Sequence, residues 1–101
     1  MSKSLSQRVR EARLIHSKQL RNCQAWVEEC EDRETGEIYK RLRSYNTIVA
    51  CVLDTEQGRT CVKFDYEFYY RGYTRHSSRT TSQQISKFIK ELRCDYVCKE
   101  A

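Results

Sequence analysis

Residues 47–53 read TIVACVL, a continuous apolar run rich in β-branched side chains. Such a run is typical of a central strand, because β-branched residues pack well on the pleated surface of a sheet. The polar stretch DTEQG at residues 54–58 follows, with a glycine that suits a tight turn, and RTCVKF at residues 59–64 returns as a second strand. The sequence therefore predicts an antiparallel hairpin whose strands span 46–54 and 59–65.

A second hairpin is predicted upstream, over about residues 24–43. Its turn is DRETGE at residues 32–37, where Gly36 suits the position that needs a positive φ. Alternating side chains follow in IYKRLR, residues 38–43, as expected for a strand. The first arm, residues 24–31, fits either a strand or the end of a helix, because its apolar residues also keep helical spacing.

Helices are predicted on both sides of these hairpins. Apolar side chains recur at three- and four-residue steps through the segments 4–22 and 82–93, which is the spacing of an amphipathic helix. Ser4 is the expected N-cap of the first helix, with Gln7 completing a capping box. The predicted fold class is α+β: one domain, residues 1–101, with a small antiparallel sheet of three to four strands flanked by an N-terminal and a C-terminal helix.

Charge is unevenly distributed along the chain, which carries a net charge of +5. Residues 1–25 hold six basic side chains and one acidic, residues 26–37 hold one basic and six acidic, and residues 69–93 again hold six basic and one acidic. The sequence thus predicts two basic elements and one acidic hairpin. Surfaces of both signs suit a nucleoprotein partner or docking on a charged protein surface.

The six cysteines are expected to be reduced thiols: Cys23, Cys30, Cys51, Cys61, Cys94 and Cys98. Charged residues interrupt every apolar run near the N-terminus, so no signal peptide is expected, and the predicted location is the cytoplasm. No apolar stretch approaches the length of a membrane span, so no membrane contact is expected. Cys94 and Cys98 form one close pair without a second, and neither a metal site nor a cofactor is predicted.

Catalysis is not expected. His76, Ser77 and Ser78 are adjacent in the sequence, but a nucleophilic triad needs groups that converge in space with an orienting carboxylate. A polar loop explains these residues more simply. Three scattered glycines cannot form a phosphate-binding loop. We therefore predict a binding protein with no catalytic residues.

The segment 66–81, YEFYYRGYTRHSSRTT, carries the strongest functional signal. Tyrosine offers a flat face with a polar tip and arginine a rigid fork, and both are enriched at binding hot spots and suit stacking on unpaired bases. The alternative is a structural role at the sheet edge. The candidate partner-binding residues are Tyr69, Tyr70, Arg71, Tyr73, Arg75 and Arg79, with Lys87 and Lys90 on the predicted last helix. A secondary basic face on the first helix comprises Arg8, Arg10, Arg13, Lys18 and Arg21.

Three motifs carry a resemblance: TGEIY at residues 35–39, SYNTIVA at residues 44–50, and SRTTS at residues 78–82 followed by Phe88. Together they resemble a family of short proteins encoded by bacteriophages and other mobile elements, which share an S-Y-x-T-x-V-A strand, a small hairpin and a T-T-S step that opens a final helix. In this pattern we expect Tyr45 to pack on the last helix.

The resemblance implies a context. Small proteins of this origin often inhibit host machines, including CRISPR effectors. The expected function is therefore a counter-defence inhibitor, anti-CRISPR-like, that binds a host protein or protein–nucleic-acid complex in the bacterial cytoplasm and occludes a surface. The alternatives are a direct DNA- or RNA-binding regulator and a structural accessory protein of the element. The oligomeric state is not predicted.

Overall fold

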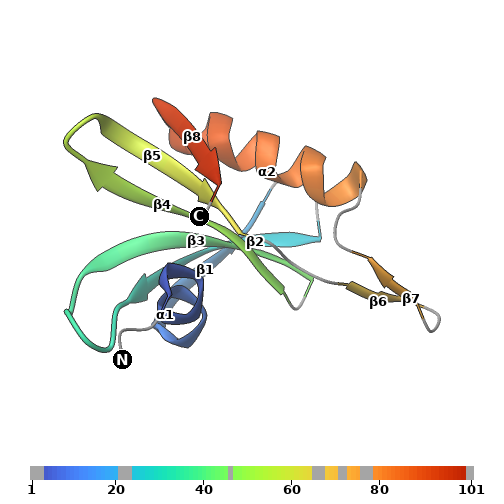
Figure 1. Cartoon of the computed structure of the whole chain (residues 1–101), viewed down its shortest axis with the longest axis horizontal. Coiled ribbons are helices and arrows are strands. Elements are labelled where there is room, and N and C mark those ends of the chain that lie inside the picture. Colours follow the sequence, from blue (N-terminus) through green and yellow to red (C-terminus); the bar gives the residue numbers. More distant parts are fainter. Residues whose placement is uncertain are drawn as a thin grey trace.

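A computed structural model of the chain describes residues 4–20, 24–45, 47–64, 68–70, 73–75 and 79–99. Figure 1 shows the elements in chain order: α1 (Leu5–Glu11), β1 (Arg13–Gln19), β2 (Ala25–Glu31), β3 (Ile38–Ser44), β4 (Thr47–Thr55), β5 (Gly58–Lys63), β6 (Phe68–Tyr70), β7 (Tyr73–Arg75), α2 (Arg79–Leu92) and β8 (Tyr96–Lys99). The arm 24–31, which the sequence left open between helix and strand, is the strand β2.

The main sheet has six strands in the order β1-β2-β3-β4-β5-β8. Strands β1 to β5 pair antiparallel with their neighbours, and β8 joins β5 in parallel. The predicted three- to four-stranded antiparallel sheet is therefore wrong, and the sheet is larger and mixed. The physical reason lies in the outer strands: all residues of β1 and β8 are exposed, so they show no alternation of buried and exposed positions that a sequence pattern could reveal.

The helix predicted over residues 4–22 is wrong beyond Glu11. Ser4 caps α1 as predicted, its Oγ accepting a hydrogen bond from the Gln7 amide at 3.3 Å. At the other end, the guanidinium of Arg41 on β3 donates to the carbonyls of Val9 at 2.6 Å and Ala12 at 3.1 Å. These bonds satisfy helix-end carbonyls, after which the chain turns into β1.

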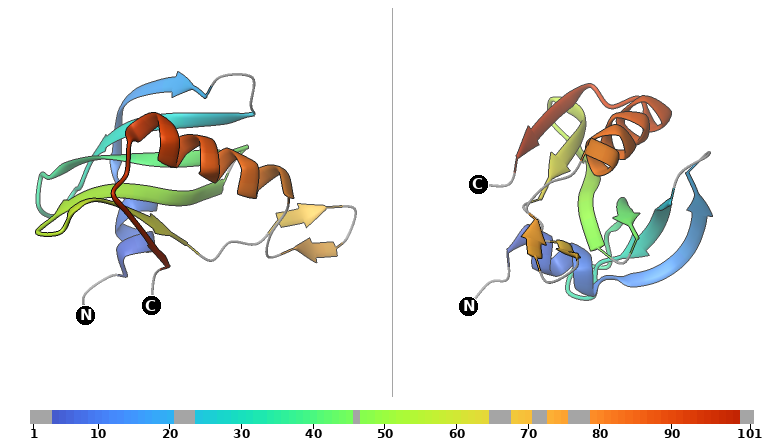
Figure 2. Two further views of the ribbon diagram at one scale, coloured as in Figure 1. Left: turned by 90° about the horizontal axis from the view of Figure 1, so that it is seen from above. Right: turned by 90° about the vertical axis from the view of Figure 1, so that its right-hand side faces the viewer.

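The two helices cover opposite faces of the sheet. Figure 2 shows the sheet curving around α2, with α1 against its other face. One core cluster joins α2 to the sheet and includes Val52 and Phe88, and the other lies under α1 and includes Val9 and Cys51. Neighbours on β4 thus belong to opposite cores, which explains why TIVACVL is continuously apolar.

Polar contacts fix both ends of α2, which begins at Arg79, earlier than the predicted start at residue 82. At its start, Ser44 Oγ on β3 lies 2.5 Å from Gln84 Oε1 and 3.3 Å from Thr81 Oγ1, and these groups are buried. At its end, Arg59 Nη1 on β5 donates to the Leu92 carbonyl at 2.6 Å. Tyr45, which follows Ser44 and is predicted to pack on the last helix, is 49 % exposed.

Candidate functional site

The secondary basic face predicted on the first helix is partly neutralised within the molecule. Arg8 donates to Asp32 Oδ2 from Nη2 at 2.8 Å and from Nε at 3.1 Å, and Arg13 pairs with Glu31 at 3.1 Å. Two residues of the predicted partner-binding face therefore form ion pairs with the acidic hairpin inside the molecule. Arg10 and Lys18 are exposed, and Arg21 lies outside the described residues.

Asp32 is the buried anchor of this contact. Its Oδ1 accepts hydrogen bonds from the amides of Glu34 at 2.8 Å and Thr35 at 3.1 Å, and its Oδ2 accepts from the Tyr39 hydroxyl at 3.2 Å. Burial alone would raise the pKa of Asp32, but these amide bonds and the Arg8 guanidinium outweigh it and hold the pKa below its usual value. The carboxylate is therefore charged at neutral pH and joins the hairpin turn to α1.

A second buried carboxylate, Glu28, holds two arginines. Its Oε1 accepts from Arg41 Nε at 2.9 Å, and its Oε2 accepts from Arg43 Nε at 2.9 Å. The Arg43 guanidinium also stacks on Trp26, 4.3 Å from the ring centroid, and donates to the Tyr45 carbonyl at 2.6 Å. This cluster of Trp26, Arg43 and Tyr45 was missed from the sequence, because the β2–β3 register is what places Trp26 opposite Arg43.

The Tyr/Arg-rich segment contributes a separate two-stranded ribbon, β6–β7, whose register pairs Tyr70 with Tyr73 and Tyr69 with Thr74. Figures 1 and 2 show this ribbon standing apart from the six-stranded sheet, beside the start of α2. The predicted site residues Tyr69, Tyr70, Tyr73 and Arg75 lie on the ribbon, Arg79 begins α2, and Arg71 lies outside the described residues.

The remaining predicted site residues, Lys87 and Lys90, are exposed on α2. The buried residues Ile85 and Phe88 lie on the face of the same helix that packs on the sheet. Both lysines therefore point away from the sheet. They lie on α2, the helix that follows the ribbon in the chain.

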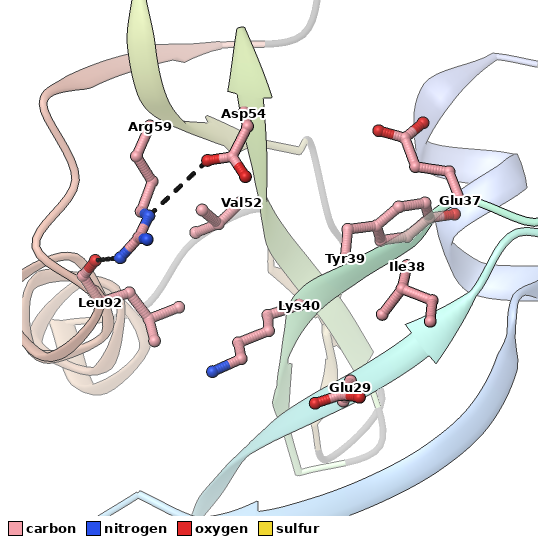
Figure 3. Close-up of a pocket in the computed structure, with 9 residues that line it drawn as sticks. All are labelled: Glu29, Glu37, Ile38, Tyr39, Lys40, Val52, Asp54, Arg59 and Leu92. Atoms are coloured by element: carbon pink, nitrogen blue, oxygen red, sulfur yellow. Dashed lines mark hydrogen bonds and ion pairs between the residues drawn. The ribbon is translucent and has the colours of Figure 1, made fainter.

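A polar groove lies on the α2 face of the sheet, near the end of the helix (Figure 3). Its larger cavity has a volume of about 260 Å³ and a smaller one of about 130 Å³ adjoins it, and both are lined by Glu29, Lys40 and Leu92. Arg59 Nε and Asp54 Oδ1 lie 3.8 Å apart on one side of the larger cavity. The polar residues that line this cavity are mostly charged and carry both signs: Glu29, Glu37, Lys40, Asp54 and Arg59.

Burial keeps two of the described thiols in the neutral form. Burial raises the pKa of Cys30 to about 11 and that of Cys61 to about 12, so both are protonated at neutral pH. Cys30, Cys51, Cys61, Cys94 and Cys98 are free, and Cys23 lies outside the described residues. Within the described ranges no group of three or more histidine, cysteine, aspartate or glutamate side chains could hold a metal ion. The candidate triad, residues 76–78, also lies outside them.

No protein-family model, no curated protein and no solved structure matches the chain. In the part of the chain that the structure describes, neither helix has the length and apolar character needed to span a bilayer.

Proposed function

We propose that the chain is a non-catalytic binding protein of phage or mobile-element origin that inhibits a host nucleoprotein machine, in the manner of an anti-CRISPR protein, by occluding one of its surfaces. It acts in the cytoplasm of the bacterial host. The observation that supports this most is the ribbon β6–β7, in which a segment rich in tyrosine and arginine stands apart from the sheet.

A projecting ribbon suits occlusion, because it can enter a cleft of a partner while the six-stranded sheet stays rigid behind it. Tyrosine and arginine bring large contact areas and directed hydrogen bonds, and both are enriched among the residues that dominate interface energies. Lys87 and Lys90 add two exposed cations on α2, the helix that begins at Arg79.

The internal ion pairs favour a protein surface over bare nucleic acid as the main partner. Non-specific binding to nucleic acid depends on free cations that neutralise phosphates. Here Arg8, Arg41 and Arg43 are bound to buried carboxylates, so these three guanidinium groups are already engaged inside the molecule. A direct DNA- or RNA-binding regulator remains the alternative, and the experiment separates the two.

The test replaces Arg71, Tyr73 and Arg75 with alanine and measures binding to host proteins captured from lysate, with and without nuclease treatment. Removing a hot-spot residue typically costs about 2 kcal/mol or more, so we expect at least a roughly thirtyfold loss of affinity. Wild-type binding should survive nuclease treatment. Binding that disappears with the nuclease would support the direct nucleic-acid regulator instead.

A control matched in charge removes two cations and one tyrosine from the exposed edge strands: Lys18, Tyr96 and Lys99 to alanine. This control should change affinity only slightly and mainly through salt dependence. Equal losses in the two triple variants would contradict the assignment of the site to the ribbon.

A further inference from the structure

Tyr45 has a backbone conformation that a tyrosine adopts only at a cost. Its φ is +52°, in the left-handed region where the Cβ atom crowds the following carbonyl. Glycine or asparagine enters this region more readily. The backbone at this turn therefore gives no reason for an aromatic side chain.

Core packing gives no reason either. The Tyr45 residue is 49 % exposed and belongs to neither core cluster. Its backbone is held from both sides, since its amide donates to the Gln24 carbonyl at 3.0 Å and its carbonyl accepts from Arg43 Nη1 at 2.6 Å. The structure thus keeps a large aromatic residue at a fixed position on the surface, and strained positions of this kind are concentrated at functional sites.

The side chains of Arg43 and Trp26, near the Tyr45 backbone, are also planar and held in place. Arg43 is clamped by Glu28 at 2.9 Å, stacks on Trp26 at 4.3 Å, and remains partly exposed. The exposed Tyr45 residue, whose carbonyl accepts from Arg43, and the guanidinium that stacks on an indole provide the types of group on which proteins stack unpaired bases.

The position of this turn connects it with the rest of the proposed surface. Ser44, which directly precedes Tyr45, contacts Thr81 and Gln84 in the first turns of α2. Figure 1 shows the end of β3 and the ribbon β6–β7 at the same end of the molecule. The strand β7, which contains Arg75, and the start of α2 at Arg79 therefore lie at the same end of the molecule as this turn.

We propose that Tyr45, together with the Arg43–Trp26 stack, binds an unpaired base of a single-stranded nucleic acid by stacking. This inference rests on the proposed function, because a host nucleoprotein machine is the source of such a strand. It adds a specific nucleic-acid contact to an interface that is otherwise made with protein.

Trp26 is the only tryptophan of the chain, so its fluorescence reports directly on this site. The experiment titrates the protein with short oligodeoxythymidylate and oligouridylate, and with a duplex of the same length. We expect single strands to quench Trp26 and the duplex to leave it unchanged. Tyr45→Gly and Tyr45→Asn should each weaken single-strand binding about tenfold, whereas Tyr45→Phe, which keeps the ring, should bind like the wild type.

The melting temperatures of these variants distinguish a binding role of Tyr45 from a structural one. Because glycine and asparagine relieve the positive φ, both variants should melt at or above the wild-type temperature. Tyr96→Ala is the matched control, since Tyr96 is also 49 % exposed but lies on β8, and it should not change oligonucleotide binding.

Three outcomes would overturn the inference: no response of Trp26 to single strands, unchanged affinity in both Tyr45 variants, or a lower melting temperature in both. If Trp26 does not respond while the wild type still binds nuclease-treated host protein, the base-stacking site fails and the proposed function stands. If single strands bind through Tyr45 but no host protein is captured, the stacking site stands and the inhibitor proposal fails.

Discussion

At the scale of single residues, the molecule is organised by arginines bound to buried carboxylates. Asp32 and Glu28 are both buried, and they receive hydrogen bonds from Arg8, Arg41 and Arg43. Burying a carboxylate is costly unless it is paired and hydrogen-bonded, and losing one partner leaves the other uncompensated. The acidic hairpin and the basic N-terminal segment therefore stabilise each other rather than face separate partners.

Asp32→Asn tests this pairing. It should lower the free energy of unfolding at pH 7 by about 2–3 kcal/mol, because the amide nitrogen cannot accept the Arg8 hydrogen bonds. The folded-state pKa of Asp32 lies below its usual value, so its contribution is present above the unfolded-state pKa of about 4 and is lost as the pH falls through the folded-state pKa. Urea unfolding at a series of pH values should show that the difference in the free energy of unfolding between wild type and variant decreases below about pH 4.

Asp54→Asn is the control for this prediction. Its carboxylate is largely exposed and lies 3.8 Å from Arg59, so its loss should change stability by no more than about 0.5 kcal/mol. A gap between wild type and Asp32→Asn that stays constant from neutral to acid pH would show that the Asp32 charge does not carry the effect.

At the scale of elements, arginines from the strands bind the carbonyls at the ends of both helices. Arg41 on β3 binds the last carbonyls of α1, and Arg59 on β5 binds the last carbonyl of α2. Cations at a helix C-terminus also interact favourably with the helix dipole. The β4–β5 hairpin is further tied to the segment after α2, where Asp95 Oδ2 accepts from the Arg59 amide at 3.0 Å and the Asp95 amide donates to the Arg59 carbonyl at 2.7 Å.

Gly58 tests this tie. Its φ is +129°, and a Cβ atom there would lie 2.6 Å from Asp95 Oδ2, so Gly58→Ala combines backbone strain with displacement of Asp95. We expect a loss of about 1–3 kcal/mol in the free energy of unfolding, with faster amide exchange in β8. Gly36→Ala is the control, since at φ +74° its Cβ would meet nothing within 4 Å, and it should cost only about 1 kcal/mol. Equal losses in the two variants would argue against a role for the Asp95 contact.

At the scale of the whole molecule, two covered sheet faces contrast with two exposed edges. Helices α1 and α2 cover the faces, whereas β1 and β8 are exposed along their length. A bulge between Leu14 and His16 and the exposed Lys18 interrupt the β1 edge, and β8 is only four residues long. These features are the ones by which proteins prevent unwanted pairing at sheet edges.

The cysteines report on this arrangement. Among the five cysteines that the structure describes, Cys98 on the exposed β8 should be alkylated first under native conditions. Cys30, Cys51 and Cys61 are buried and should react at least about a thousandfold more slowly, through global unfolding. Peptide mapping by mass spectrometry measures the order. After denaturation without reductant all six cysteines should be modified, and recovery of only four would reveal a disulfide and contradict the predicted reduced state.

Several features follow from local sequence. The run TIVACVL indicates a strand wherever it sits in the fold, because β-branched apolar residues favour that conformation and require burial. Ser4 indicates the start of α1, because its hydroxyl accepts a hydrogen bond from the amide of a residue only three positions further on. Ile85 and Phe88 show helical spacing because their helix packs one face on the sheet. Each of these signals depends on neighbours in the chain.

The features that sequence reasoning missed depend on contacts between distant segments. Residues 13–19 became an edge strand rather than a helix because β2 supplies hydrogen-bond partners, while their exposed side chains carry no periodic burial. Two cations of the predicted basic N-terminal face, Arg8 and Arg13, are paired with Asp32 and Glu31 of the acidic hairpin. The exposure of Tyr45, at 49 %, and the bond from Arg43 to its carbonyl also depend on how β2 pairs with β3. The local sequence pattern thus specifies which residues are buried. The pairing of strands that are remote in the sequence specifies which charged and aromatic side chains remain available to a partner.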